Sequence, residues 1–439
     1  MYYIVETYEQ LSMLEPVEYC FVDVITLNDQ SHPKLTSPCV IYYNNGTKGY
    51  IFPIDHSETF GIGIDSIEKF LSYHKAVFCI DLKFSSYFLS NENLEDVIEV
   101  IINKGEAVPD LYCDTKIQRD YYNKFYFKPD LNRVLPISKL YEKSECLYEK
   151  IAIHIGPVEF ETKSKKIARI YREVELNGIR LNEELFNKHF ETPWSGHSIK
   201  DGLIYTSYNL HNITGRPTNS FNSVNFLAIN KDNGSRKAFL PQNDAFVEFD
   251  FEAYHLKLIA KIVRYEFDSS ESVHSILGKQ YFKTEQLTDE QYAKSKELSF
   301  RMIYGGIYEE YKNIPFFKKI SAFIEHLWEK YINEGYVTLL TGRRLYFNEN
   351  MNPQKLFNYL LQNAETAVNI SILESIQTLC KDLKSFVTLV VYDSLLIDFS
   401  FKDGKDILQQ IKHTIITHGL TCTVKYGTDY SSLRKLNYL

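Results

Sequence analysis

The sequence predicts two folded parts in succession, an N-terminal α/β domain and a C-terminal α+β domain. Three observations carry this prediction. Up to about residue 155, short apolar runs alternate with turn-rich segments, a pattern typical of strands with intervening helices. From about residue 165 a helical period takes over. Further along, two apolar strand patterns surround Asp250 and Asp393, with long helical segments between them.

The N-terminal part is predicted from four apolar runs that suit strands in a mixed sheet. Turn-forming pieces such as NNGT and NDQSHP separate them, and such pieces favour loops. The domain boundary is expected between residues 150 and 165. The runs are EYCFVDVITL (18–27), SPCVIYY (37–43), GYIFPI (49–54) and KAVFCIDL (75–82).

The C-terminal part opens with a helical pattern at 165–186, interrupted by Asn177-Gly178, which predicts a helix end and a turn. The elements expected after it are a strand at 204–209, a polar loop at 212–235, a strand ending at Asp250, helices to about 337, a strand pair at 336–347, a helix at 353–383, two strands flanking Tyr392-Asp393, and a last helix and strand.

The composition indicates a folded protein of two or three domains. The chain has 439 residues, of which 15% are aromatic, and that length can bury more than one core. No apolar run approaches the length of a membrane span, and MYYIVETYEQ lacks the features of a signal peptide. We therefore expect a cytoplasmic location and no membrane partner.

The net charge and the cysteine content argue against two further classes of protein, nucleic-acid coat proteins and proteins held together by zinc or disulfides. The net charge of −8 argues against a passive nucleic-acid coat, because phosphate binding needs clustered Lys and Arg. An acidic enzyme can still keep one basic groove. The seven cysteines form no CxxC pair, so neither a zinc site nor a disulfide framework is indicated.

Asp250 and Asp393 are the first candidates for chemistry. Each interrupts an apolar strand pattern, and a buried carboxylate is costly unless it is paired, hydrogen-bonded or bound to a cation. Two such groups could jointly hold a pair of Mg²⁺ ions, roughly 3.5–4 Å apart, for phosphoryl transfer. Either Asp alone is better explained as a turn or cap residue.

A helix predicted at 287–307 makes the metal-site interpretation of Asp250 and Asp393 more favourable than the interpretation as turn or cap residues. Thr288 and Gln291 form a capping box, and Lys296, Phe300 and Tyr304 follow at i, i+4 and i+8. At helical spacing these three fall within about 80° on one face. A cation and two aromatic rings on one face suit a nucleoside triphosphate. An ordinary amphipathic helix with a solvated Lys would explain the stretch if it stood alone.

Together these segments resemble, in order, motifs A, B and C of family A DNA polymerases, the bacterial DNA polymerase I family. The order of several motifs is more specific than any one of them, and the resemblance covers residues 165–439. Further matches are REVELNGIRLN (172–182), IYTSYNLHNITGR (204–216), RKAFLP (236–241), VTLLTGRRLYF (337–347) and NYLLQNAETAVNI (358–370).

The resemblance implies a right-hand polymerase with a palm at about 200–265 and 337–439 and fingers at about 266–336. Its implied partners are primer-template DNA, dNTPs and a processivity factor or other replisome protein. Its implied cofactor is a pair of Mg²⁺ ions, with Mn²⁺ able to substitute. The implied residues are Asp250 and Asp393 as catalytic metal ligands; Lys296, Phe300, Tyr304 and His255 for the nucleotide; and Arg216, Arg343, Asn358, Gln362 and Tyr392 for DNA.

Three positions depart from the family pattern. Tyr292 replaces an Arg of motif B, so one triphosphate contact is missing unless Lys294 supplies it. His255 replaces the Glu that helps exclude a ribose 2′-hydroxyl, which puts sugar discrimination in doubt. Ser394 replaces the second carboxylate of motif C.

Two modules also depart from the pattern. Only residues 187–203 are available for the thumb, so the duplex grip and the processivity are expected to be weak. Residues 1–155 resemble the family's RNase H-like 3′–5′ exonuclease, with Asp23 kept. Proofreading is expected to be lost, although Asp81 and Asp114 are candidates for a rearranged site. Family ligands are replaced by Ile25 and Ser85, and the third motif is missing near Tyr148, which Ala152 follows where an Asp is expected.

Two other functions compete with an active DNA polymerase. A non-catalytic nucleic-acid-binding scaffold would keep the shape, but it has no reason to keep Asp250, Asp393 and Lys296 together. A single-subunit RNA polymerase shares the Lys-Tyr-Gly helix, whereas the T-G-R segment and the exonuclease-like leader favour DNA synthesis. The reduced architecture would suit a viral or mobile-element replicon, either on the host nucleoid or in an infected cell.

Overall fold

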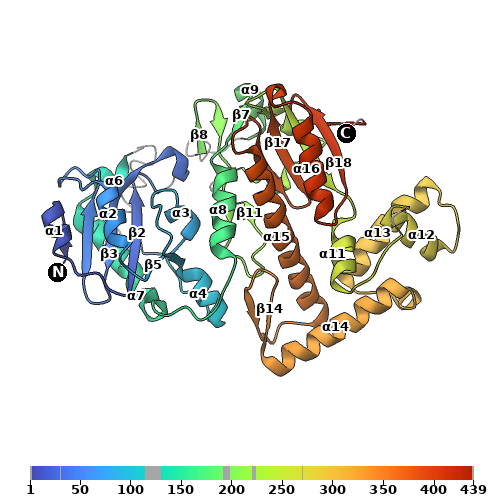
Figure 1. Cartoon of the computed structure of the whole chain (residues 1–439), viewed down its shortest axis with the longest axis horizontal. Helices are drawn as coiled ribbons and strands as arrows, with labels where there is room; N and C mark the ends of the chain where they lie inside the picture. The colour runs from blue at the N-terminus through green and yellow to red at the C-terminus, as the bar shows by residue number, and fades with distance from the viewer. Residues whose placement is uncertain are drawn as a thin grey trace. The chain divides into compact units, whose positions relative to one another are not determined.

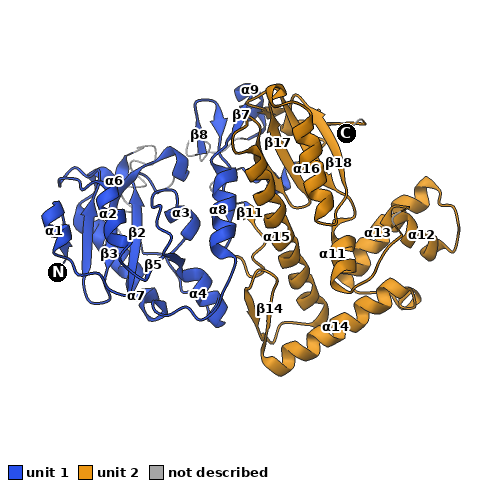
Figure 2. Ribbon diagram, viewed as in Figure 1, with its two compact units in different colours: residues 1–211, 219–229 blue, residues 212–218, 230–439 orange. Residues whose placement is uncertain are grey.

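The chain folds into two compact units (Figure 2). Unit 1 comprises residues 1–211 and 219–229, and unit 2 comprises residues 212–218 and 230–439. The computed structural model describes residues 2–29, 31–113, 130–190, 198–219, 224–268 and 270–437. Within these ranges, every helix is too short or too polar to cross a bilayer.

Unit 1 is built on a six-stranded mixed sheet in the order β1-β4-β3-β2-β5-β6. The pairs β2/β3 and β3/β4 are antiparallel, whereas β1/β4, β2/β5 and β5/β6 are parallel. The four strands expected from the apolar runs are confirmed as β2 to β5. The strands are β1 (Tyr3–Ile4), β2 (Tyr19–Thr26), β3 (Pro38–Asn44), β4 (Gly49–Pro53), β5 (Ala76–Cys79) and β6 (Leu94–Asp96).

Helices cover both faces of this sheet. Successive side chains of a strand point to opposite faces, and β3 accordingly sends Ile41 and Tyr43 into one buried cluster and Val40 and Tyr42 into the other. Helices α1 (Tyr8–Ser12), α2 (Ile64–Leu71) and α3 (Leu82–Ser85) contribute to the first cluster, and α4 (Val97–Lys104), α6 (Leu131–Val134) and α7 (Ile137–Ile151) to the second.

Unit 1 extends beyond the boundary expected at 150–165. Helix α8 (Ser164–Glu175) packs on α3, where buried Lys83 and Glu175 form an ion pair. The expected strand at 204–209 is two short strands, because the carbonyl of Thr206 accepts a hydrogen bond from His32 instead of a neighbouring strand. The later elements are β7 (Ile179–Leu181), α9 (Glu183–His189), β8 (Ile199–Lys200), β9 (Leu203–Ile204) and β10 (Tyr208–Asn209).

Unit 2 is built on a five-stranded antiparallel sheet in the order β16-β17-β13-β18-β19. The apolar sequence AFVEFDF explains why β13 occupies its buried middle. In this register Asp250 lies opposite Ser394 of β17 and Thr423 of β18. The strands are β13 (Ala245–Phe251), β16 (Phe386–Val391), β17 (Ser394–Phe399), β18 (Cys422–Gly427) and β19 (Arg434–Lys435).

The longest helix of unit 2, α15 (Pro353–Cys380), starts at an Asn352 cap with proline in its first turn. It packs against α11, α13, α14 and α16, as Figure 1 shows for α14 and α16. The remaining elements are β11 (Thr218–Asn219), β12 (Phe239–Leu240), α11 (Tyr254–Ile262), α12 (Val273–Phe282), α13 (Asp289–Gly305), α14 (Pro315–Glu334), β14 (Tyr336–Thr338), β15 (Arg344–Tyr346) and α16 (Asp406–Thr417).

Candidate active site

The sheet of unit 2 brings Asp250 and Asp393 to the same end of its strands. Asp250 is the last residue but one of β13. Asp393 lies in the tight turn between β16 and β17, where Val391 pairs with Ser394 and Tyr392 has a φ of 49°. The N–H of Phe251 donates to the carbonyl of Asp393 at 2.8 Å. Two acidic residues more than a hundred positions apart in the sequence therefore become neighbours.

The electrostatics of the two carboxylates fit a cation site. Burial raises the pKa of Asp393, and the negative charges of Asp250 and Glu365 raise it further. Asp250 remains reachable, with 40% of its side chain exposed. Carboxylates are the hard oxygen ligands that Mg²⁺ and Mn²⁺ prefer. These two repel one another at an accessible end of the sheet, where a cation would relieve the repulsion.

Lys425 of β18 also lies at this end of the sheet, and the sequence did not single it out. Its Nζ is 2.6 Å from Asp250 Oδ2 and 2.8 Å from Glu248 Oε2. Burial lowers the pKa of Lys425, but the two carboxylates outweigh it and raise the pKa. A metal bound by Asp250 would therefore share that carboxylate with an ammonium group. The only signal in the sequence was the alternation of β18, which does not reveal its register.

Helix α13 starts at the predicted capping box. Thr288 Oγ1 accepts from the N–H of Gln291, and Gln291 Oε1 accepts from the N–H of Thr288. The ring of Phe300 is 63% exposed and lies 4.6 Å from that of Tyr304. The ammonium of Lys296 lies 4.6 Å from the centre of the Tyr292 ring. The helix thus presents a cation and an open aromatic ring on its predicted face.

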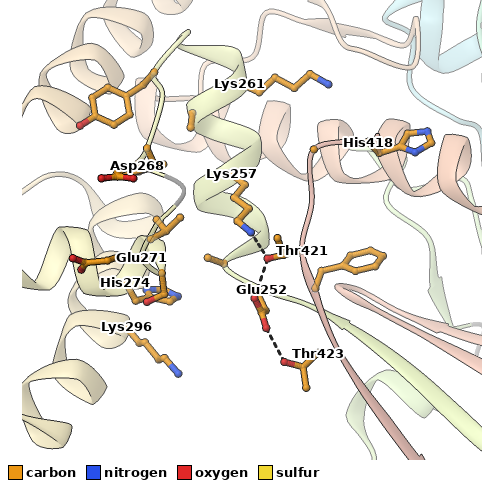
Figure 3. A pocket seen from close by; sticks show the side chains of 18 of the residues that line it. Glu252, Lys257, Lys261, Asp268, Glu271, His274, Lys296, His418, Thr421 and Thr423 are labelled. Carbon is orange, nitrogen blue, oxygen red and sulfur yellow. Dashed lines mark hydrogen bonds between the residues drawn. The ribbon is translucent and has the colours of Figure 1, made fainter. Parts of the chain in front are cut away.

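A cavity of about 1000 Å³ opens between α12 and α13 on one side and α11 with residues 417–423 on the other. In Figure 3, Lys296 and His274 lie across it from Lys257, Thr421 and Glu252. Burial, together with the charges of Lys296 and Lys257, lowers the pKa of His274 to about 4. Its ring is therefore neutral at pH 7. The cavity is also lined by three lysines and three carboxylates, namely Lys257, Lys261, Lys296, Glu252, Asp268 and Glu271.

Neither Lys257 nor His274 was predicted from the sequence. Lys257 lies on the helix that follows Asp250, and His274 lies in the first turn of α12. Each is a single polar residue in an amphipathic pattern, which gives no sign of a cavity. Lys294, considered as a substitute for the missing arginine, forms an ion pair with Glu297, and so does Arg301.

Glu365 of α15 joins four of the predicted residues, and the sequence did not single it out either. Its carboxylate is 2.8 Å from His255 Nε2 and accepts from Nε and Nη2 of Arg216 at 3.0 and 2.9 Å. His255 Nδ1 is 2.6 Å from Tyr304 Oη, and the Arg216 guanidinium lies 3.9 Å from the centre of the Tyr392 ring. The sequence did contain one signal for Glu365, because it is a charged residue on a face of α15 that is otherwise mostly apolar.

The other predicted DNA contacts lie around this cluster. Asn358 Nδ2 donates to the carbonyl of Tyr304 at 3.0 Å, which ties α15 to the end of α13. Arg343 is only 4% exposed, and its guanidinium donates to the carbonyl of Asn212. Gln362 is half-buried and lies one turn before Glu365 on α15.

Comparison with known proteins adds independent findings. No protein-family model matches the chain. DNA polymerase I of Synechocystis sp. is 27% identical over 172 residues, 33% of this chain and 17% of that protein. DNA polymerase I of Bacillus subtilis strain 168 is 23% identical over 259 residues, 50% of this chain and 29% of that protein. A solved structure, the POL domain of Pol1 from M. smegmatis in complex with DNA primer-template and dNTP, matches with a TM-score of 0.66 and 14% identity, over 94% of this chain and 95% of that chain.

The chain is similar to DNA polymerase I proteins over part of its sequence and to a DNA polymerase domain in its fold. The matched stretches span less than a third of either curated relative, and at 14% identity the solved structure shows a shared fold. The mixed α/β fold of this polymerase-like protein is therefore similar to that of a polymerase domain.

In unit 1 of this polymerase-like protein, the exonuclease candidates lie in two places. Asp23 of β2 accepts from Ser144 Oγ at 2.6 Å, and burial raises its pKa. Asp81 caps α3 by accepting from the N–H of Phe84. Within the described ranges, the one group of three possible metal ligands is Asp81, Asp96 and His211, and it does not include Asp23. Asp114 lies outside the described residues.

Proposed function

We propose that this chain is a template-directed DNA polymerase that adds dNTPs to a primer 3′-hydroxyl. The observation that carries the proposal is that Asp250 and Asp393 lie next to each other at one end of the sheet. The cavity lined by Lys296 of α13 adds to it. The similar M. smegmatis domain is described in complex with DNA primer-template and dNTP.

The two aspartates would hold a pair of Mg²⁺ ions, which supply electrophilic stabilisation of the phosphate and an acidified 3′-hydroxyl; Mn²⁺ could substitute. Lys296 and Lys257 would meet the triphosphate from opposite walls of the cavity. Phe300, with its exposed ring, would stack on the nucleotide. Tyr292 leaves the position of the family arginine without a cation, and Lys257 offsets that loss.

The proposed DNA contacts depend on a preorganised surface. Glu365 holds Arg216 beside Tyr392, so the guanidinium has a fixed position near the catalytic turn. Charged groups held in place by such partners lose less entropy on binding. The proposed contacts to the primer-template are Arg216, Arg343, Asn358, Gln362 and Tyr392.

We also propose that the chain contains two domains with different roles. Residues 1–155 would form an exonuclease-like domain without proofreading, which is supported by Ser85 at a ligand position and by the hydrogen bond of Asp23 to Ser144. Residues 165–439 would form the polymerase domain, with the palm and fingers bounds given above. The thumb would be reduced to residues 187–203, of which 191–197 lie outside the described residues.

One observation favours the alternative of a non-catalytic DNA-binding scaffold. The ammonium of Lys425 already neutralises Asp250, and a protein cation at a catalytic carboxylate is what a site that has lost its metals could retain. The same ion pair is compatible with catalysis if the metals bind through the free carboxylate oxygens. Activity distinguishes the two functions.

Primer extension tests the proposal. With a short primed template, Mg²⁺ and the four dNTPs, we expect extension by the native chain and a loss of at least about a hundredfold in Asp250→Ala and Asp393→Ala, equivalent to about 2.7 kcal/mol of transition-state stabilisation. Asp406→Ala, which changes an exposed carboxylate of α16, is the matched control and should extend normally. Equal extension by the aspartate variants would contradict the proposal. DNA binding without any extension by the native chain would favour the scaffold.

A further inference from the structure

Unit 1 contains another groove, of about 500 Å³, that the proposed polymerase chemistry does not use. Helix α8 forms one of its walls, and α3 with the following residues 86–94 forms the other. The two helices pack against each other, as Figure 1 shows. We call this site the α8 groove. Its volume is in the range of sites that bind a ligand, so the chemistry of its walls indicates what it can bind.

The α8 wall of this groove is strongly cationic. Lys165, Arg169 and Arg172 line it, and at positions i, i+4 and i+7 they fall within about 60° on one face of the helix. Lys166 also lines the groove, whereas Glu92 is the one carboxylate among the described lining residues. Four cations and one carboxylate give the lining a net charge of +3, although the whole chain carries −8. Such a local excess of cations favours an anionic ligand.

The α8 groove also has an apolar part. Leu82, Leu89 and Leu94 line it, and they belong to the first buried cluster of unit 1. Because these leucines are buried, they form the floor of the groove beneath its cations. Ala168, on the same face of α8 as the cations, lines the groove too. An apolar group placed on this floor would be removed from water, which favours binding. The groove therefore suits a ligand with both negative charges and an apolar group.

Carboxylates and main-chain carbonyls of this chain already bind to the cations of the α8 wall. Lys165 Nζ is 2.6 Å from Glu95 Oε1 and donates to the carbonyl of Glu92 at 3.3 Å. The guanidinium of Arg172 donates to the carbonyl of Ser86. These are the two kinds of oxygen that an acidic peptide presents, so the wall can bind such a peptide with contacts of the same kind.

Arg169 provides a further contact on the same wall. It lies between Lys165 and Arg172 on this face of α8, and its side chain is exposed. A guanidinium can hold a carboxylate through two parallel hydrogen bonds, which adds both strength and geometric specificity. A carboxylate of a ligand that enters the groove can therefore bind at the middle of the cationic wall.

Nucleic acid is the other polyanion that a cationic groove could bind. Sites for single strands combine cations with aromatic rings on which the bases stack, and the described residues that line this groove include no aromatic ring. A duplex binds through its phosphates and would leave the leucine floor unused. The lining therefore favours a peptide with carboxylates and an aliphatic side chain over a nucleic acid.

We propose that the α8 groove binds an acidic segment of a partner protein. Carboxylates of the segment would bind to Arg169 and Lys166, and an apolar side chain would rest on the leucine floor. Clusters of Arg are a recurring means of recognising acidic motifs. The inference goes beyond the proposed polymerase function and does not depend on it.

Binding of a defined peptide tests this inference. The probe is a fluorescein-labelled peptide of alternating Asp, Glu and Leu residues, and fluorescence anisotropy measures its affinity for the full chain. We expect saturable binding that weakens as the salt concentration rises, because exposed ion pairs are screened. The same peptide with Asn and Gln in place of Asp and Glu, or with Ser in place of Leu, should bind at least about tenfold more weakly.

Substitutions on α8 locate the binding site. Arg169→Glu should weaken binding of the acidic peptide at least about tenfold, because it places a carboxylate in the middle of the cationic wall. Lys163→Glu is the matched control, since it changes the net charge equally at the exposed N-cap of α8, outside the groove; it should leave the affinity unchanged. Arg169→Gln should weaken binding less than Arg169→Glu. Circular dichroism checks the folding of each variant, and Arg169→Gln carries the comparison if Arg169→Glu does not fold.

Several results would overturn the inference. These are no binding of the acidic peptide by the native chain, equal binding of the peptide without carboxylates, and an equal loss of affinity in Arg169→Glu and Lys163→Glu. A labelled dT oligonucleotide that displaces the peptide and depends on Arg169 in the same way would assign the groove to nucleic acid instead. Because the peptide assay needs no primer extension, its failure leaves the proposed polymerase function untouched, and a failure of primer extension leaves the peptide result untouched.

Discussion

His211 and Asp96 form an ion pair in unit 1, with 2.9 Å between Nε2 and Oδ2. The same carboxylate accepts from the N–H groups of Leu82 and Glu99. Burial opposes the charge of His211, but Asp96 and Asp81 outweigh it and raise the pKa of His211 to about 9. One pair therefore joins the loop before unit 2 to the starts of α3 and α4.

This pair predicts a pH-dependent stability of unit 1. The pKa of an unfolded histidine is about 6.5, so the folded state binds the proton more tightly. The stabilisation is fully present below pH 6.5 and is lost as the pH rises through about 9. It amounts to at most about 3.4 kcal/mol, because the shift is about 2.5 pKa units and one unit corresponds to about 1.36 kcal/mol.

His211→Gln should remove this stabilisation. We expect amide hydrogen exchange in α3 and α4 to be faster in the variant than in the native chain at pH 6.5, with the difference shrinking above pH 9. Each comparison is made at one pH, which cancels the intrinsic exchange rate. His413→Gln on the exposed side of α16 is the control. A difference that stays constant from pH 6.5 to 9.5 would contradict the assigned ion pair.

At the level of elements, α12 and α13 pack closely at Gly278. A Cβ placed there would lie 2.8 Å from Leu287 Cδ1 and 2.9 Å from Ser295 Cβ. Ser295 is fully buried, and its hydroxyl donates to the carbonyl of His274. The close approach therefore fixes the position of His274 across from Lys296 on the wall of the cavity.

Gly278→Ala should push these helices apart. Overpacking typically costs about 1–3 kcal/mol, and we expect a lower unfolding temperature and a higher KM for dNTPs, because His274 and Lys296 move relative to each other. Gly305→Ala is the matched control, since a Cβ there meets nothing within 4 Å; it should be neutral or slightly stabilising. Unchanged thermal unfolding and KM in Gly278→Ala would show that the helices can adjust without loss.

Local signals explain which elements could be predicted from the sequence. The capping box and helical period placed α13 at 287–307, and it spans Asp289–Gly305. The helix expected at 353–383 is α15, which spans Pro353–Cys380. Asp250 and Asp393 stood out because each interrupts an apolar run.

Residues that depend on register or tertiary contacts could not be predicted. Lys425 lies next to Asp250 only because Asp250 pairs with Thr423. Glu365 contacts His255 only because α15 packs on α11. Compact unit 1 likewise continues past 150–165 to residue 211, and the buried Lys83–Glu175 ion pair, which joins α8 to α3, is a tertiary contact that the sequence does not reveal.

At the level of the whole molecule, two features would limit how firmly the proposed polymerase holds a duplex. The net charge is −8, which opposes binding to phosphates outside a local basic surface. The described part of 187–203 holds only the end of α9, the short strand β8 and the first residue of β9. A duplex grip needs many Lys and Arg contacts to phosphates, and this stretch offers little chain to supply them.

Extension under single-encounter conditions should therefore give short products. With an excess of trap DNA, we expect the native chain to add only a few nucleotides before dissociating, because few phosphate contacts oppose release. Without the trap, repeated rebinding should carry the same primer to the end of the template, which serves as the control for activity. Lower salt should lengthen the trapped products, since phosphate binding strengthens steeply as salt falls. Products of hundreds of nucleotides at physiological salt with the trap present would contradict a reduced thumb and would mean that other surfaces of this chain hold the duplex.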